Sequence, residues 1–89
     1  MPKAEISWKR EAPDGVRWQV YAQHVGNRWL FYRRERRYDQ WQSLPDPPLE
    51  DWIELLDAVR RRIARRLLRP EEEGRVIGSI RTQYPEATL

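Results

Sequence analysis

Hydrophobic and polar residues alternate with a period of two through the first half of the chain, which is the pattern of half-buried β-strands. The alternation predicts three strands, at residues 6–11, 16–25 and 28–34. Ala12-Pro13-Asp14-Gly15 separates the first two and is typical of a turn, because proline presets φ and glycine accepts a positive φ. Gly26-Asn27 separates the next two and suits a two-residue type II′ hairpin. Residues 38–43 are compatible with a short fourth strand.

The Gly26-Asn27 turn predicts a register for the second hairpin. Its facing pairs are Val25 and Arg28, Ala22 and Phe31, and Tyr21 and Tyr32. Since successive side chains point to opposite faces, the apolar ones share one face, the expected core face. This face collects Ile6, Trp8, Trp18, Val20, Ala22, Trp29 and Phe31. The other face is aromatic and basic, and collects Arg17, Gln19, Tyr21, Gln23, Arg28, Leu30, Tyr32 and Arg34.

The position of Trp41 depends on the loop after the third strand. A three-residue loop at 35–37 places Trp41 opposite Phe31 on the core face, whereas a two- or four-residue loop places it on the other face. We expect the three-residue loop, because burial of so large an aromatic side chain favours folding.

Apolar residues in the second half recur at helical spacing. They predict a first helix from about Pro48 to Leu68, with an apolar stripe of Leu49, Trp52, Ile53, Leu56, Val59, Ile63 and Leu67. Arg69-Pro70 ends this helix, and Pro70 followed by three glutamates starts a second that runs to about Tyr84. Pro85 ends the second helix, and residues 85–89 are expected to fray.

These elements predict an α+β fold, in which a three- to four-stranded antiparallel meander packs on two C-terminal helices. The 89 residues suit a single domain. Within it we expect the meander at 1–44, a proline-rich hinge at 45–48, the two-helix segment at 49–84 and the frayed tail at 85–89.

Composition narrows the functional classes. The chain has no cysteine, which excludes disulfides and cysteine-based zinc sites. A protein without disulfides is suited to a reducing compartment. No apolar run approaches the ~20 residues of a membrane span, and residues 1–5 hold no apolar segment typical of a secretory signal. We therefore expect a cytoplasmic protein that does not enter a membrane.

The sequence contains no pattern that indicates catalysis, a metal site or a cofactor. His24 is the only histidine, and a sheet histidine with structural contacts is the expected state. Ser7, Ser43 and Ser79 stand in no nucleophile motif, and the four glycines form no phosphate-cradling loop. We expect a non-enzymatic binding module without cofactors.

Charged residues make up 35% of the chain, and its net charge is +3. Nearly all of the basic residues are Arg, so arginine supplies the candidate chemistry for binding phosphate or carboxylate groups. The sheet-side set for nucleic acid is Arg17, Tyr21, Arg28, Tyr32, Arg34, Arg36 and Arg37, where rings stack on bases and guanidinium groups hold phosphates. The helix-side set adds phosphate contacts from Arg61, Arg62, Arg65 and Arg69.

Other interpretations of the same residues remain open. The helix arginines also stabilise the negative end of the helix dipole, and Asp57 with Arg61 is a favourable i,i+4 pair. Tyr21 opposite Tyr32 is a stabilising cross-strand pair. Arg60 falls inside the apolar stripe, which favours a structural anchor. The alternative function is a protein-interaction module or homodimer that uses an exposed strip at Trp52 and Leu55.

Overall fold

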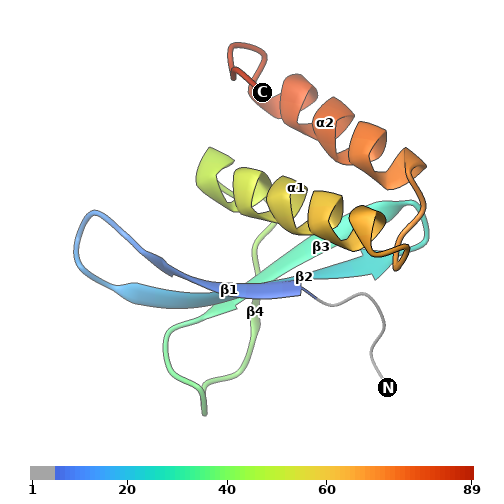
Figure 1. Cartoon of the computed structure of the whole chain (residues 1–89). Coiled ribbons are helices and arrows are strands. Elements are labelled where there is room, and N and C mark those ends of the chain that lie inside the picture. The colour runs from blue at the N-terminus through green and yellow to red at the C-terminus, as the bar shows by residue number, and fades with distance from the viewer. Residues whose placement is uncertain (1–5) are drawn as a thin grey trace. The chain divides into compact units, whose positions relative to one another are not determined.

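The computed structural model describes residues 6–89, so residues 1–5, where we expected no secretory signal, lie outside the described part (Figure 1). Four strands come first: β1 (Ile6–Glu11), β2 (Arg17–Val25), β3 (Arg28–Arg34) and β4 (Gln42–Ser43). Two helices follow, α1 (Leu49–Ala64) and α2 (Glu71–Gln83). The strands form one antiparallel sheet in the order β1-β2-β3-β4, so the α+β class and the meander are confirmed.

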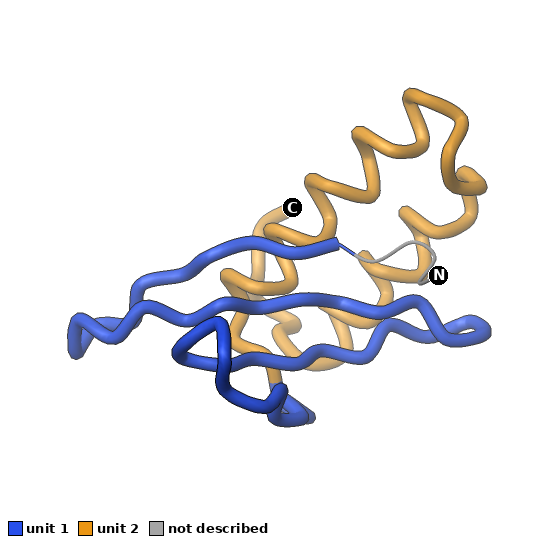
Figure 2. Tube along the Cα trace, turned by 90° about the horizontal axis from the view of Figure 1, so that it is seen from below, with its two compact units in different colours: residues 1–46 blue, residues 47–89 orange. Residues whose placement is uncertain are grey.

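The chain divides into two compact units, residues 1–46 with the sheet and residues 47–89 with the helices (Figure 2). The boundary falls within the segment 45–48 expected as a hinge. The single domain and the packing of the sheet on the helices stay predictions.

Both predicted β-turns are present. The backbone N–H of Gly15 donates to Ala12 O at 2.9 Å, and Gly15 has a φ of +88°. Gly26 has a φ of +59°, as the first central position of a type II′ turn requires. Val25 pairs with Arg28 across this turn, and the pairing continues to Tyr21 and Tyr32, so the predicted register is confirmed.

One face of the sheet is buried, as the alternation predicts. Its buried residues are Ile6, Val20, Ala22, Trp29 and Phe31. Trp8 and Trp18 on the same face are half-buried. The Trp8 ring meets Phe31 edge to face with centroids 6.2 Å apart, and the Arg33 guanidinium lies 4.1 Å from the Trp18 ring centroid. Paired aromatic rings and a cation over an indole each stabilise this face beyond simple burial.

The expected position of Trp41 is wrong. Tyr32 pairs with Ser43 and Arg33 with Gln42, so Trp41 lies on the outer face with Arg34 rather than opposite Phe31. The loop is longer than expected because Asp39 closes a turn within it: its backbone N–H donates to Arg36 O at 2.8 Å, and its carboxylate accepts from the Arg36 N–H at 3.0 Å. Trp41 gains its contacts from outer-face side chains and stays 37% exposed.

The first helix ends four residues earlier than expected, at Ala64. Arg66 adopts a left-handed φ of +62°, its N–H donates to Ile63 O, and the Leu67 N–H donates to Arg62 O. This pair of bonds is a Schellman motif, which satisfies the last carbonyl groups of a helix and usually uses glycine at the left-handed position. Because arginine stands there instead, the sequence carries no stop signal before Pro70.

α1 and α2 lie side by side and antiparallel within the second unit (Figure 1). Arg60 Nε of α1 donates to Glu73 Oε2 of α2 at 2.8 Å in an ion pair that joins the two helices, with the side chains 49% and 39% exposed. Because exposed ion pairs contribute little to stability, the anchoring role of Arg60 stays a prediction. The Tyr84 hydroxyl donates to Pro47 O at 2.8 Å, which ties the end of α2 to the start of α1. Val76 and Ile80 of α2 are fully buried.

The buried face of α1 differs from the predicted stripe. It comprises Asp51, Trp52, Leu55, Leu56, Ala58 and Val59. Ile53, a member of the stripe, is 40% exposed, and Leu67 beyond the helix end is 62% exposed. The predicted stripe omits Ala58, whose side chain is small and permits close approach. When Ala58 is counted, the centre of the buried face moves toward Leu55. Within residues 6–89, no helix is both long and apolar enough to span a bilayer.

Candidate nucleic-acid interface

Three aromatic rings form a cluster on the outer face of the sheet. Tyr21 and Tyr32 occupy facing positions on β2 and β3, and their rings stack with centroids 4.8 Å apart and planes 19° apart. Trp41, just before β4, meets Tyr21 edge to face at 4.6 Å and 78°. All three positions belong to the first unit, and none of the three rings is fully buried. The cluster is a partly exposed aromatic surface, and exposed aromatic side chains are what unpaired nucleobases stack on.

Arg34 is the cation closest to this cluster. Its guanidinium lies 4.1 Å from the Trp41 ring centroid, and its Nε donates to Gln19 Oε1 at 2.8 Å. A longer contact of 3.4 Å runs from its Nη1 to Asp39 O. These partners are an indole, an amide oxygen and a backbone carbonyl, none of which carries a charge. They orient the guanidinium while leaving its positive charge unneutralised.

The loop between β3 and β4 carries further basic and aromatic side chains. Arg36 Nη1 donates to the Tyr38 hydroxyl at 3.1 Å, and Tyr38 is 76% exposed. Arg37 is exposed. Within residues 6–89, no carboxylate lies within ion-pair distance of Arg34, Arg36 or Arg37. The loop also holds Glu35 and Asp39, so it presents arginines that no carboxylate pairs directly but carries no net positive charge of its own.

A shallow concavity of about 410 Å³ lies in the same unit and is bounded partly by Trp41 and Arg34. The other polar residues that line it are Ser7, Lys9, Gln19 and Arg37. Its volume is in the range of about 300–1,000 Å³ typical of small-ligand sites. Three lining residues are cationic and none is acidic, so an anionic ligand suits it electrostatically.

The sheet-side residues expected from sequence are only partly brought together. Tyr21, Tyr32 and Arg34 lie in the cluster described above. Arg28 shares their face and is exposed, but it stands four residues from Tyr32 along β3, roughly 13 Å away at 3.3 Å per residue. Arg17 is exposed at the start of β2, opposite Glu11 in the register.

The helix-side arginines have different surroundings from one another. Arg61 forms an i,i+4 ion pair with Asp57, as the helix-stability interpretation expected. Arg62 is half-buried. Arg65 and Arg69 are exposed on either side of the left-handed Arg66. These two residues are the strongest phosphate-contact candidates of the helix-side set.

The interface alternative required an exposed apolar strip on α1. Trp52 and Leu55 are instead 5% and 0% exposed, so no such strip exists at these residues. This expectation is wrong because both side chains belong to the buried face of α1.

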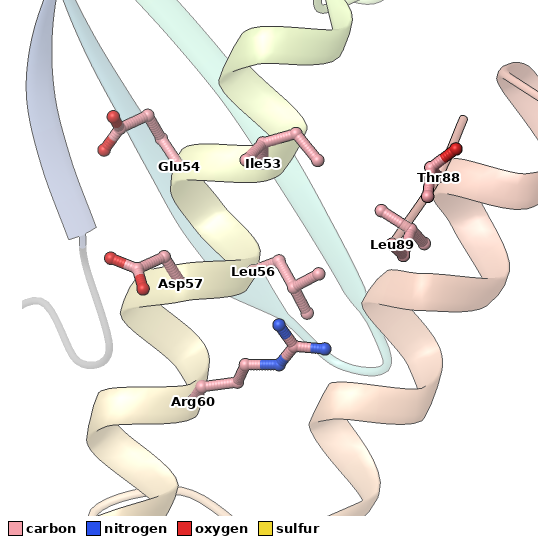
Figure 3. Close-up of a pocket in the computed structure, with 7 residues that line it drawn as sticks. All are labelled: Ile53, Glu54, Leu56, Asp57, Arg60, Thr88 and Leu89. Atoms are coloured by element: carbon pink, nitrogen blue, oxygen red, sulfur yellow. The ribbon is translucent and has the colours of Figure 1, made fainter.

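A second hollow, of about 350 Å³, lies between α1 and the C-terminal segment (Figure 3). Ile53, Leu56 and Arg60 lie on the side of α1 toward Leu89, whereas Glu54 and Asp57 lie on its other side. The Arg60 guanidinium is already paired with Glu73. The hollow offers no uncompensated cation and is a poor site for a phosphate.

Sequence reasoning missed Trp41, Lys9 and Gln19 as members of the candidate interface. Lys9 and Gln19 face each other on β1 and β2 and share the face of Tyr21. The predicted alternation already placed Gln19 on that face, whereas Trp41 depended on a loop length that composition does not reveal.

His24 has the kind of structural contact that the sequence predicts for it. His24 stacks on Trp29 with centroids 4.5 Å apart. Within residues 6–89, no three histidine or carboxylate side chains lie close enough to hold a metal ion. Comparison of the chain with protein-family models, with curated proteins and with solved structures finds no match.

Proposed function

We propose that this chain is a non-enzymatic binding module for single-stranded nucleic acid, and that the outer face of its sheet is the binding surface. The observation that carries the proposal is the Tyr21–Tyr32–Trp41 cluster with Arg34 on its indole and no carboxylate beside that guanidinium. Aromatic rings stack on unpaired bases of any identity, and arginines track the phosphates between them.

The charge distribution supports a flexible anionic strand as the ligand. Arg36 and Arg37 extend the cationic surface from Arg34 into the loop after β3. A strand bound at the aromatic cluster can follow this loop with its phosphates. Arg65 and Arg69 would supply further phosphate contacts from the second unit, and Arg17 and Arg28 would serve as outlying contacts on the sheet. The absence of cysteine suits the cytoplasm as its location.

The first test is fluorescence anisotropy of a labelled oligonucleotide of about 12 nucleotides, titrated at about 50 mM salt. If about three to five phosphates are neutralised, affinity should fall roughly 20- to 130-fold between 50 and 200 mM salt. An absence of any anisotropy change at the lower salt concentration would remove the proposal.

The second test replaces Trp41. Trp41→Ala should weaken binding roughly 5- to 150-fold, because base–aromatic stacking contributes about 1–3 kcal/mol per base. Trp41→Phe keeps an aromatic face and should restore most of the affinity. Arg81→Ala, an exposed arginine of α2 outside both candidate sets, is the control and should bind like the wild-type protein. Equal affinity of Trp41→Ala and wild type would show that the cluster is not the binding surface.

A further inference from the structure

The concavity beside Trp41 is built almost entirely from hydrogen-bond donors. Lys9, Arg34 and Arg37 line it, and lysine and arginine side chains only donate hydrogen bonds. Gln19 Oε1 accepts from Arg34 Nε, which holds the oxygen toward Arg34 and leaves the NH₂ group, a donor, as the other end of the amide. The acceptor capacity left in the lining is the Ser7 hydroxyl and one lone pair of Gln19 Oε1. A matching ligand must therefore offer acceptors.

A nucleotide with a carbonyl-rich base fits this arrangement. Its phosphate is an acceptor that suits Lys9 and Arg37, and its base has a flat face that suits the Trp41 indole and the Arg34 guanidinium plane. Uracil and thymine present two carbonyl oxygens, whereas adenine presents an exocyclic amine where those bases have a carbonyl. An amine pointed at the Gln19 NH₂ group would leave donor facing donor.

We propose that this concavity is a one-nucleotide subsite that prefers uracil or thymine over adenine, with Gln19 as its specificity-determining residue. This inference rests on the proposed single-strand binding. The Arg34–Gln19 hydrogen bond carries it, because that bond fixes which end of the Gln19 amide is left to meet the base.

The matched variants are Gln19→Leu and Gln23→Leu. Both residues lie on the outer face of β2, and Gln23 lies two positions beyond Tyr21, away from the concavity lining. Leucine is close to glutamine in size, so each variant removes the amide with little change in packing. Circular dichroism checks that both remain folded.

Binding is measured with labelled oligouridine, oligothymidine and oligoadenosine probes of about 12 nucleotides at about 50 mM salt. We expect the wild-type protein to bind the uracil and thymine probes at least about fivefold more tightly than the adenine probe. Because stacked adenines themselves resist binding, the decisive quantity is the change of this ratio between variants. Gln19→Leu should bring the ratio of uracil or thymine affinity to adenine affinity toward that of a site that does not distinguish these bases. Gln23→Leu should leave this ratio unchanged.

The outcomes separate this inference from the proposed function. If all probes bind and the ratio is the same in wild type and Gln19→Leu, the subsite assignment is overturned while single-strand binding stands. If no probe binds, the proposed function fails and the subsite with it. A difference between the uridine and thymidine probes that is unaffected by Gln19→Leu would come from the ribose 2′-hydroxyl or from the C5-methyl group of thymine, neither of which Gln19 reads.

Discussion

Arg66 is the one non-glycine residue with a positive φ in the described chain. A side chain with a Cβ loses roughly 1–2 kcal/mol in the left-handed region, and glycine avoids this loss. The residue nevertheless occupies the position that ends α1, between the exposed Arg65 and Leu67. The hydrogen bonds of the Schellman motif around Arg66 offset the strain of its left-handed conformation.

Replacing Arg66 with glycine should stabilise the protein. We expect Arg66→Gly to raise the free energy of unfolding by about 0.5–1 kcal/mol, since the relief of strain exceeds the added entropy of the unfolded chain. Urea denaturation measures it. Arg65→Gly is the control, because Arg65 has a φ of −93° and glycine offers no relief there. A loss of stability in Arg66→Gly as large as in the control would contradict this account.

At the scale of the elements, side-chain hydrogen bonds close two connections that the sequence pattern did not predict. Asp39 closes the turn between β3 and β4 and thereby places Trp41 on the outer face. Tyr84 joins the end of α2 to Pro47, two residues before α1, through Pro47 O. The Asp39 bond is local to its loop, whereas the Tyr84 bond joins segments 37 residues apart.

Removing the Tyr84 hydroxyl should loosen the helix pair. Tyr84→Phe deletes one part-buried hydrogen bond to a backbone carbonyl, and we expect a loss of roughly 1 kcal/mol in the free energy of unfolding. Tyr38→Phe is the matched control, because its hydroxyl accepts from Arg36 in an exposed loop and its loss should change stability little. Equal stability of Tyr84→Phe and wild type in thermal or urea unfolding would show that this bond contributes nothing net.

At the scale of the whole molecule, the modest net charge of +3 hides a local separation of charge. The acids Glu50 and Asp51 lie in the first turn of α1, and Arg61 and Arg62 in its last turn. Part of the positive charge is thus used within the second unit, while the loop after β3 keeps cations without carboxylate partners. Binding should therefore depend on which arginines are removed and not only on how many.

The salt dependence of binding tests this point. If Arg65 and Arg69 contact phosphates of the bound strand, each alanine variant should reduce the slope of log K against log salt by about 0.7. Arg81→Ala removes the same charge from an exposed position of α2 and should leave the slope unchanged. Identical slopes in all three variants and wild type would confine the phosphate contacts to the sheet.

The sequence alone determined the parts of this protein that depend on local periodicity and turn chemistry. Alternation predicted β1 to β3 and separated their faces, and Gly26 predicted the register that joins Tyr21 to Tyr32. Helical spacing predicted both helices, and the i,i+4 spacing of Asp57 and Arg61 predicted their ion pair. Each of these features is set by neighbours close in the chain, so the residues themselves carry the information.

Only the tertiary structure decided where Trp41 lies, where α1 ends and which face of α1 is buried. Burial favoured the core-face position of Trp41, but the loop closed by Asp39 places it on the outer face. Arg66 ends α1 without the glycine that is the usual sequence signal for a helix end, and the buried face of α1 includes Leu55 and Ala58, which lie outside the predicted stripe. These outcomes depend on hydrogen bonds and packing between groups whose meeting no local pattern records, and the candidate interface around Trp41 depends on them in turn.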